Sequence, residues 1–499
     1  MRKIIGIILV AVLLLQLSPI SNASETYLEN IEKSNYSIGT GNITYPAVKY
    51  RTDESSFAMS LLAGDITGDG VSEIMGVSLE KNKLFVYDNT LHLLWSFKDS
   101  RGDNWTSLHA LKITSIAVGD VDGDGITDVL FSISPALTSI DSPIVIEHPE
   151  AVLYAFRGDG TEIWNKSFPG AITQDALEIY DINNDGKNEI LVGADNLYLL
   201  ASNGTVIATY DLDTYLFRGI SEIIARGNEV VFTFWNFSSA QSSYTDYFRV
   251  YNAYFTVVKT SFDGDSFECL WVKNLEDDKG LFSPRFYRMF SDSSFHRAYI
   301  IKEEPSALVC IDLFSGKTLW ENKSVSPAGL GVAVSDNNIF VNQGDIISVL
   351  DSNGCAKVST NVYSGSASSS ETARFTISVF DIDNDGQQEI LLTDKKGLIC
   401  FSDNGEKKWN VSLWNSWNGG YAYTTPPLLH NDTDNDGFDE LITTDPTGYI
   451  VIIDSATPPV SAHQNFSNSQ IIWGAGAVAV VVAIIVIVWL KRRKKNGGH

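Results

Sequence analysis

The sequence predicts an all-β protein, an eight-bladed β-propeller with a single C-terminal transmembrane helix. Three observations predict it: a strand–turn–strand unit recurs about every fifty residues, an aspartate-rich motif recurs in step with it, and helical periodicity is lacking between the termini. The 499 residues are 44% hydrophobic and 19% charged, which is enough apolar surface for a large buried core.

The recurring hairpin has alternating apolar residues around a turn rich in Asp, Asn and Gly, and its second strand often ends in Trp. Such turns join antiparallel strands. Clear copies span Leu84–Trp95, Leu153–Trp164, Thr260–Trp271, Leu308–Trp320 and Leu398–Trp409, and weaker copies begin at Leu197, Ile346 and Tyr449. These eight copies have a mean spacing near 52 residues, and four short strands per repeat of this length are typical of a propeller blade.

The last repeat ends one strand short, at Asp454. The segment Tyr45–Tyr50 has strand character, so we expect it to complete the last blade and close the ring. The propeller then occupies residues 45–455. Seven blades is the alternative count, and a linear β-solenoid is a less favoured architecture.

The second recurring motif reads D-x-[DNT]-x-D-G-x-x-[DE] and precedes an apolar run. It begins at Asp65, Asp120, Asp181, Asp381 and Asp432, with gaps of 55, 61, 200 and 51 residues. The long gap is about four periods, so three repeats there lack the motif. Calcium binds six to eight oxygen atoms at about 2.3–2.6 Å, and alternate positions of such a loop supply them, with Gly at position 6 allowing the sharp turn.

The expected ligands are side chains at positions 1, 3, 5 and 9 and the carbonyl of position 7. They are Asp65, Thr67, Asp69, Val71 and Glu73 in loop 1; Asp120, Asp122, Asp124, Ile126 and Asp128 in loop 2; Asp181, Asn183, Asp185, Lys187 and Glu189 in loop 3; Asp381, Asp383, Asp385, Gln387 and Glu389 in loop 4; and Asp432, Asp434, Asp436, Phe438 and Glu440 in loop 5.

We therefore expect up to five Ca²⁺ ions with a structural role, since a full coordination shell leaves no position for a substrate. Thr67 and Asn183 carry no charge, so loops 1 and 3 should bind more weakly. Acidic turns without metal are the alternative interpretation.

The aspartate loops resemble FG-GAP/VCBS-type repeats, as in integrin α-chain propellers, and the Trp-ended hairpins resemble PQQ-like (quinoprotein-type) propeller repeats. Together the two resemblances cover nearly all of residues 45–455. They imply a calcium-binding propeller that acts as a binding, adhesion or surface-scaffold module. The PQQ-like resemblance also implies two alternatives, a PQQ-dependent enzyme and an envelope-protein assembly factor.

The two ends of the chain predict a single-pass type I protein of the cell membrane with an extracellular propeller. A basic N-terminus, an apolar run and small residues before a cleavage site are typical of a signal peptide. A charge-free stretch flanked by Trp and followed by five cations is typical of a membrane span. The expected segments are a signal peptide 1–23, a linker 456–470, a transmembrane helix 471–490 and a cytoplasmic tail 491–499. Past the expected signal peptide, ten N-x-S/T sequons predict a glycoprotein.

The net charge of −25 argues against nucleic-acid binding. No H-E-x-x-H, G-x-S-x-G or P-loop motif is present, and no nucleophile–base pair stands out, so we expect no enzymatic activity. The expected partner is an extracellular protein or glycan. Residues 134–150, 232–254 and 414–423 are candidate recognition segments; blade-core aromatics are the alternative. Cysteine pairs 269–310 and 355–400 could form disulfides, or all four residues could stay free thiols.

Overall fold

The computed structural model describes much of residues 46–455, and the predicted signal peptide, linker, transmembrane helix and tail lie outside this part. The described ranges are 46–56, 58, 60–78, 82–98, 111–135, 150–212, 216–237, 253–276, 288–303, 306–325, 331–335, 338–343, 346–362, 376–383, 386–393, 397–413, 427–445 and 447–455. Within them the regular structure is entirely β-strand, and no apolar helix of membrane-spanning length occurs.

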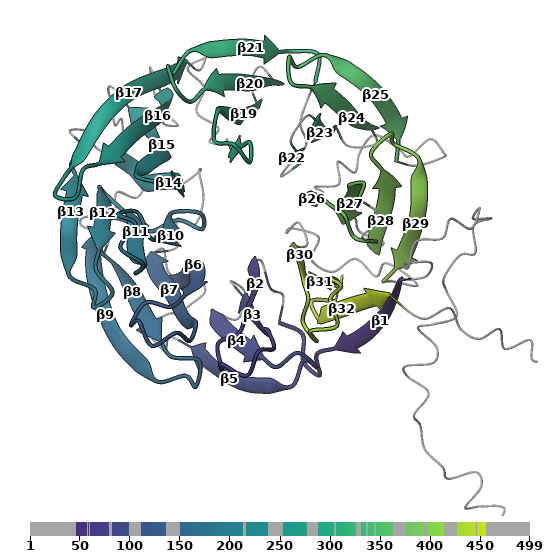
Figure 1. Cartoon of the computed structure of the whole chain (residues 1–499), viewed down its shortest axis with the longest axis horizontal. Helices are drawn as coiled ribbons and strands as arrows, with labels where there is room; N and C mark the ends of the chain where they lie inside the picture. The colour runs from purple at the N-terminus through teal and green to yellow at the C-terminus, as the bar shows by residue number, and fades with distance from the viewer. Residues whose placement is uncertain are drawn as a thin grey trace, which may run out of the picture.

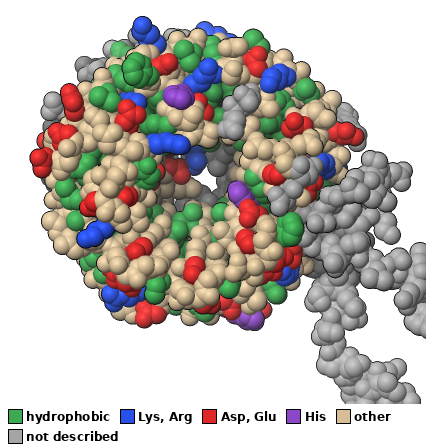
Figure 2. All heavy atoms as spheres, in the orientation of Figure 1, with side chains coloured by type: hydrophobic (Ala, Val, Ile, Leu, Met, Phe, Trp, Pro, Cys, Tyr) green, Lys and Arg blue, Asp and Glu red, His purple; other side chains and the backbone are tan. Residues whose placement is uncertain are grey.

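The described strands form eight four-stranded antiparallel sheets, the blades, arranged in a ring around a central opening (Figures 1 and 2). This confirms the all-β, eight-bladed prediction over the seven-bladed alternative.

Blades 1 to 4 follow one another along the chain. Blade 1 comprises β2 (Ser60–Gly64), β3 (Glu73–Ser78), β4 (Lys83–Tyr87) and β5 (Leu93–Lys98); blade 2, β6 (Leu111–Gly119), β7 (Asp128–Pro135), β8 (Glu150–Phe156) and β9 (Glu162–Pro169); blade 3, β10 (Leu177–Tyr180), β11 (Glu189–Gly193), β12 (Leu197–Leu200) and β13 (Val206–Tyr210); and blade 4, β14 (Leu216–Arg226), β15 (Glu229–Phe237), β16 (Ala253–Phe262) and β17 (Phe267–Glu276).

Blades 5 to 8 complete the ring. Blade 5 comprises β18 (Met289–Ser291), β19 (Arg297–Glu303), β20 (Ser306–Asp312) and β21 (Thr318–Asn322); blade 6, β22 (Val332–Val334), β23 (Asn338–Asn342), β24 (Ile346–Asp351) and β25 (Ala356–Asn361); blade 7, β26 (Thr376–Phe380), β27 (Glu389–Thr393), β28 (Gly397–Ser402) and β29 (Lys407–Ser412); and blade 8, β30 (Leu428–Asn431), β31 (Glu440–Thr444), β32 (Ile450–Ser455) and β1 (Pro46–Arg51).

The first strand of the propeller closes the ring, as predicted. β1 pairs antiparallel with β32, with Pro46 opposite Ser455 and Arg51 opposite Val451, and so supplies the outermost strand of blade 8. Figure 1 shows the two ends of the ring meeting there. Because this pairing joins the N- and C-terminal strands, every blade has four strands and the ring has no open blade.

Burial follows the position of a strand within its blade. The second strands β3, β11, β27 and β31 are buried at every position, because a neighbouring blade covers each of their faces. The outermost strands β5 and β25 alternate exposed and half-buried residues, since one face meets solvent. The core therefore lies between blades: one buried cluster joins Met75 and Leu84 of blade 1 to Phe131 of blade 2.

The Trp that ends several of the hairpins joins neighbouring blades. The indole Nε1 of Trp95 in blade 1 donates to the carbonyl of Gly158 in blade 2 at 2.6 Å. Trp164, Trp271 and Trp320 make the same kind of bond to the third-to-fourth-strand turn of the next blade, to Ser202, Leu313 and Ser352. In each of these turns a glycine with positive φ packs against the indole ring of the Trp. A Cβ on Gly160, for example, would lie 3.2 Å from the indole of Trp95.

In blades 1 to 7 the chain runs up and down from the innermost strand outward, and in blade 8 it does so over β30 to β32. The first-to-second connections of all eight blades, and the third-to-fourth connections of blades 1 to 7, therefore lie on one face of the ring, which we call the loop face. All five aspartate loops are first-to-second connections, in the consecutive blades 7, 8, 1, 2 and 3. Blades 4, 5 and 6 have shorter connections there, residues 227–228, 292–296 and 335–337, as expected from the long gap between motifs.

Candidate metal centres

Each aspartate loop is organised around its first carboxylate. In loop 1 the Oδ1 of Asp65 accepts hydrogen bonds from the backbone N–H of Gly68 at 2.7 Å and of Asp69 at 3.1 Å, and its Oδ2 accepts one from Gly70 at 2.9 Å. The position-1 aspartates of the other loops likewise accept from the position-6 glycine N–H, at 2.8–3.0 Å. The position-6 glycines have φ between 84° and 92°, so the predicted role of this glycine is confirmed.

The acid at position 9 is buried because it is the first residue of a fully covered second strand. Glu73, Asp128, Glu189, Glu389 and Glu440 are between 1% and 5% exposed. Each accepts a hydrogen bond from the backbone N–H of position 2, for example from Val121 to Asp128 at 3.0 Å and from Thr433 to Glu440 at 2.8 Å. This bond ties the end of the loop to its beginning.

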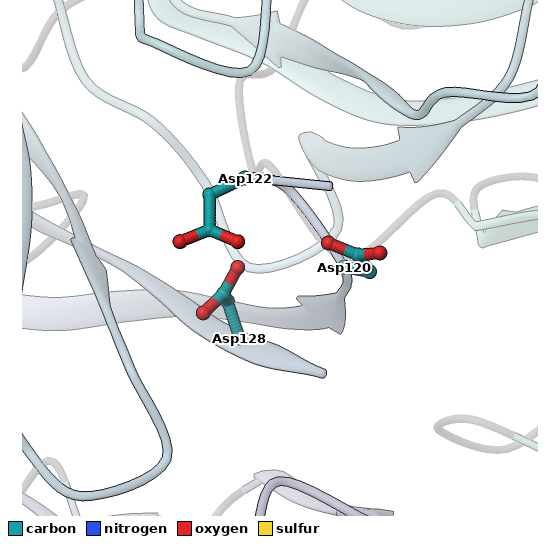
Figure 3. A group of neighbouring side chains, drawn as sticks. All are labelled: Asp120, Asp122 and Asp128. Carbon is teal, nitrogen blue, oxygen red and sulfur yellow. The ribbon is translucent and has the colours of Figure 1, made fainter. Parts of the chain in front are cut away.

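Three loops bring a triad of carboxylates together. Loop 2 joins Asp120, Asp122 and Asp128, with one oxygen of each within 4.8 Å of the others. The carboxylates of Asp122 and Asp128 face each other, with Asp120 beside them (Figure 3). Loops 4 and 5 form the equivalent triads from Asp381, Asp383 and Glu389 and from Asp432, Asp434 and Glu440. Two oxygens bound to one Ca²⁺ are at most about 5 Å apart, so this spacing suits a shared ion.

Loops 1 and 3 form no such triad among the described residues, because position 3 is neutral and bonds directly to the position-9 glutamate. The Oγ1 of Thr67 donates to Oε1 of Glu73 at 3.2 Å, and the Nδ2 of Asn183 donates to Oε1 of Glu189 at 2.9 Å. These two glutamates therefore have a hydrogen-bond partner without any metal. The geometry therefore separates loops 2, 4 and 5, which form triads, from loops 1 and 3, which do not. The charge of the position-3 side chain predicts the same division.

A cation from the outer part of the same blade contacts each aspartate at position 3, which the sequence did not reveal. Arg157 Nη2 lies 2.9 Å from Asp122 Oδ2, Lys408 Nζ lies 3.2 Å from Asp383 Oδ2, and Lys49 Nζ lies 2.6 Å from Asp434 Oδ2. Lys408 also contacts Glu389, and Lys49 contacts Asp454 at 2.7 Å. These cations reduce the repulsion within each triad.

Several carboxylate oxygens of the triads are buried without a hydrogen-bond partner among the described residues. They are Oε1 of Glu440, Oδ1 of Asp434 and Oδ1 of Asp383. A buried oxygen of this kind costs free energy unless a cation or proton satisfies it. Consistent with this, burial, together with the nearby carboxylates, raises the pKa of Asp128 to about 6 and that of Glu440 to about 7.

Positions 5 and 7 are arranged differently from positions 1, 3 and 9. The position-5 aspartate accepts the backbone N–H of position 7, as Asp124 does from Ile126 and Asp436 from Phe438. The same bond joins Asp69 to Val71 and Asp185 to Lys187. Asp385 lies outside the described residues. Coordination by position 5 and by the carbonyls of Val71, Ile126, Lys187, Gln387 and Phe438 stays a prediction.

The candidate recognition segments are only partly described. Phe232 and Phe234 are buried blade-core residues and Trp235 packs against Phe255, so the core interpretation holds for these residues, while residues 238–252 lie outside the described part. Residues 136–149 and 414–423 lie outside the described part. All four cysteines are free thiols: Cys310 and Cys400 are buried, whereas Cys269 and Cys355 are exposed, so the disulfide alternative is wrong for this structure.

Comparison with known proteins supports the propeller repeats in the C-terminal part of the chain. A PQQ-type repeat model, described as outer membrane protein assembly factor BamB, matches residues 305–468, about a third of the chain. No curated protein matches the sequence.

Among solved structures, the chain is similar to BBS1N in complex with ARL6DN, in crystals soaked with lead. The identity is 8%, the TM-score is 0.41, and 85% of this chain and 99% of that chain are covered. It is also similar to the Dos1 propeller at 9% identity and a TM-score of 0.41, covering 70% and 76%. The resemblance of residues 305–468 to PQQ-type propeller repeats rests on the family match.

Proposed function

We propose that this protein is a calcium-stabilised propeller, anchored in the cell membrane by residues 471–490, that presents a binding surface outside the cell. The observation that carries the calcium assignment is the set of three carboxylate triads, each with a buried position-9 acid, and with unpartnered buried oxygens in loops 4 and 5. Oxygen-only ligands on a glycine-bearing loop favour Ca²⁺ over softer metals.

The calcium has a structural role in this proposal. Each loop ends in the first residue of a buried second strand, so an ion bound there fixes the strand that packs between neighbouring blades. An ion that binds only the folded ring stabilises it by mass action. Loops 2, 4 and 5 are the stronger sites, and loops 1 and 3 the weaker ones.

The membrane topology predicted from the sequence supports a role in binding an extracellular protein or glycan, as an adhesion or surface-scaffold module. The apolar 20-residue stretch 471–490 is followed by Lys491–Lys495, which should remain cytoplasmic, and the ten sequons all precede it. The proposal assigns no catalytic step to the chain.

Calcium titration tests this function. We expect calorimetry of the purified chain to detect at least three strong sites, and the melting temperature to rise in millimolar Ca²⁺ relative to chelator. Asp120→Asn should remove one site, whereas Asp263→Asn, in a turn of blade 4 that has no aspartate loop, should remove none. No calcium binding by the wild type, or loss of a site with the control variant, would overturn the assignment.

A second candidate function is supported by the family match over residues 305–468. The protein described by that model is an outer-membrane assembly factor, and the PQQ-like repeats also leave a quinoprotein open. Titration with PQQ, followed by its absorbance, distinguishes a quinoprotein from a binding module. Co-purification with membrane proteins of the same cell envelope after crosslinking supports assembly-factor activity.

A further inference from the structure

The loop face is hollowed between blades 5 and 6, where the aspartate loops are missing. A groove of about 520 Å³ lies between the first-to-second and third-to-fourth turns of the two blades. Its lining includes Asp292 and His296 from one turn, Phe314 from the next, and Asn338 and Ser352 from blade 6.

Comparison with blades 1 and 2 explains why the groove forms. There, Trp95 binds the carbonyl of Gly158, and a Cβ on Gly158 would lie 1.7 Å from the carbonyl oxygen of Ile66 in loop 1. The equivalent Trp320 binds the carbonyl of Ser352 at 3.0 Å. The connection in blade 5 has five residues, 292–296, whereas that in blade 1 has eight, 65–72. The space that loop 1 fills beside Gly158 is therefore open beside Ser352 and forms the groove.

The polar groups of the groove are held in place by their own turns. Oδ1 of Asp292 accepts the N–H of His296 at 2.7 Å, and Oδ1 of Asp312 accepts the N–H of Ser315 at 2.7 Å. Among the described residues neither Oδ2 has a hydrogen-bond partner. Arg297 also lines the groove, and its Nη1 donates to the Ser352 carbonyl at 2.7 Å. Acceptors that are already fixed lose little conformational entropy when a ligand binds.

An aromatic side chain stands at the edge of the groove. Phe314 is 88% exposed and Leu319, also part of the lining, is 46% exposed. Phe314 is the most exposed of the large hydrophobic residues in the described part of the chain. A largely exposed ring beside preorganised polar groups provides a flat apolar face together with hydrogen-bond acceptors at its edge.

We propose that this groove binds a neutral saccharide. One face of a pyranose ring carries C–H groups that stack on an aromatic ring, and its hydroxyl groups donate to carboxylate and amide oxygens such as those of Asp292, Asp312 and Asn338. The groove volume falls within the usual range for small-molecule sites, about 300–1,000 Å³.

Charge selects between the classes of ligand. The chain carries a net charge of −25, and two carboxylates line the groove, so sulfated and uronic-acid glycans are disfavoured. A peptide is disfavoured because the centres of protein interfaces are depleted in charged residues, whereas Asp292, Arg297 and Asp312 all line this groove. The inference rests on the proposed function for the outward-facing propeller but does not depend on calcium.

The test is an array of neutral and anionic glycans, probed with the full chain in mild detergent. We expect retention on a subset of neutral glycans, at least ten-fold weaker binding by Phe314→Ala, and weaker binding by Asp312→Asn. Val272→Ala is the matched control, since Val272 is 55% exposed on the outer strand β17, away from the groove. Phe314 is so exposed that its replacement leaves the core intact, which a thermal melt verifies.

Three outcomes overturn the inference: retention on no neutral glycan, retention on anionic glycans only, and equal binding by wild type and Phe314→Ala. Binding of a basic peptide, competing for the same groove in preference to glycans, also overturns it. Repeating the array in chelator separates this inference from the calcium assignment. Blades 5 and 6 have no aspartate loop, so glycan binding should persist there while the melt still shows a folded ring.

Discussion

The lysine at the ring closure is the most informative position to change. Lys49 lies on β1, and its Nζ contacts Asp434 Oδ2 of loop 5 at 2.6 Å and Asp454 Oδ2 of β32 at 2.7 Å. It therefore links the closing strand, the C-terminal strand and a predicted metal loop. Lys49→Met removes the charge while keeping a long apolar side chain of similar reach.

The cost in chelator follows from the exposure of the three side chains. They are 20–29% exposed, so each ion pair is screened and contributes at most about 1 kcal/mol, and together they contribute about 1–2 kcal/mol. A ring of this size has an unfolding entropy of about 0.8 kcal/mol/K, so the melting temperature should fall by about 1–2 °C.

Calcium binding at loop 5 should change in the opposite direction. An ion bound to Oδ1 of Asp434 would lie about 5 Å from the ammonium, and a divalent and a monovalent charge at this distance repel by about 1.7 kcal/mol even at the dielectric of water. Removing the ammonium should therefore raise the calcium affinity of this site about ten-fold. The free energy of unfolding should then depend more steeply on calcium than in the wild type.

The assay is calorimetric calcium titration with paired thermal melts. Lys273→Met is the control: Lys273 is half-buried on the outermost strand β17 of blade 4 and makes no ion pair among the described residues. It should leave the calcium affinities unchanged. If Lys49→Met leaves the strongest calcium affinities unchanged or weakens them, the reasoning that the ammonium and the ion share this site is refuted.

Three further predictions follow from other parts of the ring. Trp95→Phe keeps an aromatic side chain between the blades but removes the 2.6 Å hydrogen bond to Gly158 of the next blade. The free energy of unfolding, measured by denaturant titration, should fall by about 1 kcal/mol. An unchanged midpoint would contradict the interblade role. Burial raises the pKa of Glu222 to about 8, so the folded protein holds a proton that the unfolded chain loses near its ordinary pKa, and stability should fall as pH rises from about 5 to 8. Glu222→Gln should flatten this fall in melts across pH, and an unchanged slope would contradict the assignment. Cys269 and Cys355 should react with a thiol reagent in the folded protein, and the two buried thiols only after unfolding; four reactive thiols in the native state would contradict the burial.

The sequence alone predicted most of the architecture. Strand alternation and turn residues are local, so the hairpins from Leu84–Trp95 to Leu398–Trp409 were correctly assigned, and their number and spacing gave eight blades. The last repeat lacked a strand after Asp454, and the sequence predicted that a segment near residue 45 would supply it. β1 does so by pairing with β32. The recurring motif also located the five loops. The glycine at position 6 allows the turn and the acid at position 9 begins the next strand, and both features depend on local sequence.

Only the tertiary structure decided which groups meet. Lys49 and Asp434 are 385 positions apart in the sequence, and no local periodicity predicts that pair. The same holds for the indole of Trp320 and the carbonyl of Ser352, which belong to different blades. The groove beside Phe314 exists because a loop is absent from blade 5 while its neighbours in the ring keep their spacing. Sequence patterns reflect the local conformational preferences of each strand and turn. Contacts between blades join residues far apart in the sequence, so they depend on how the closed ring positions neighbouring blades.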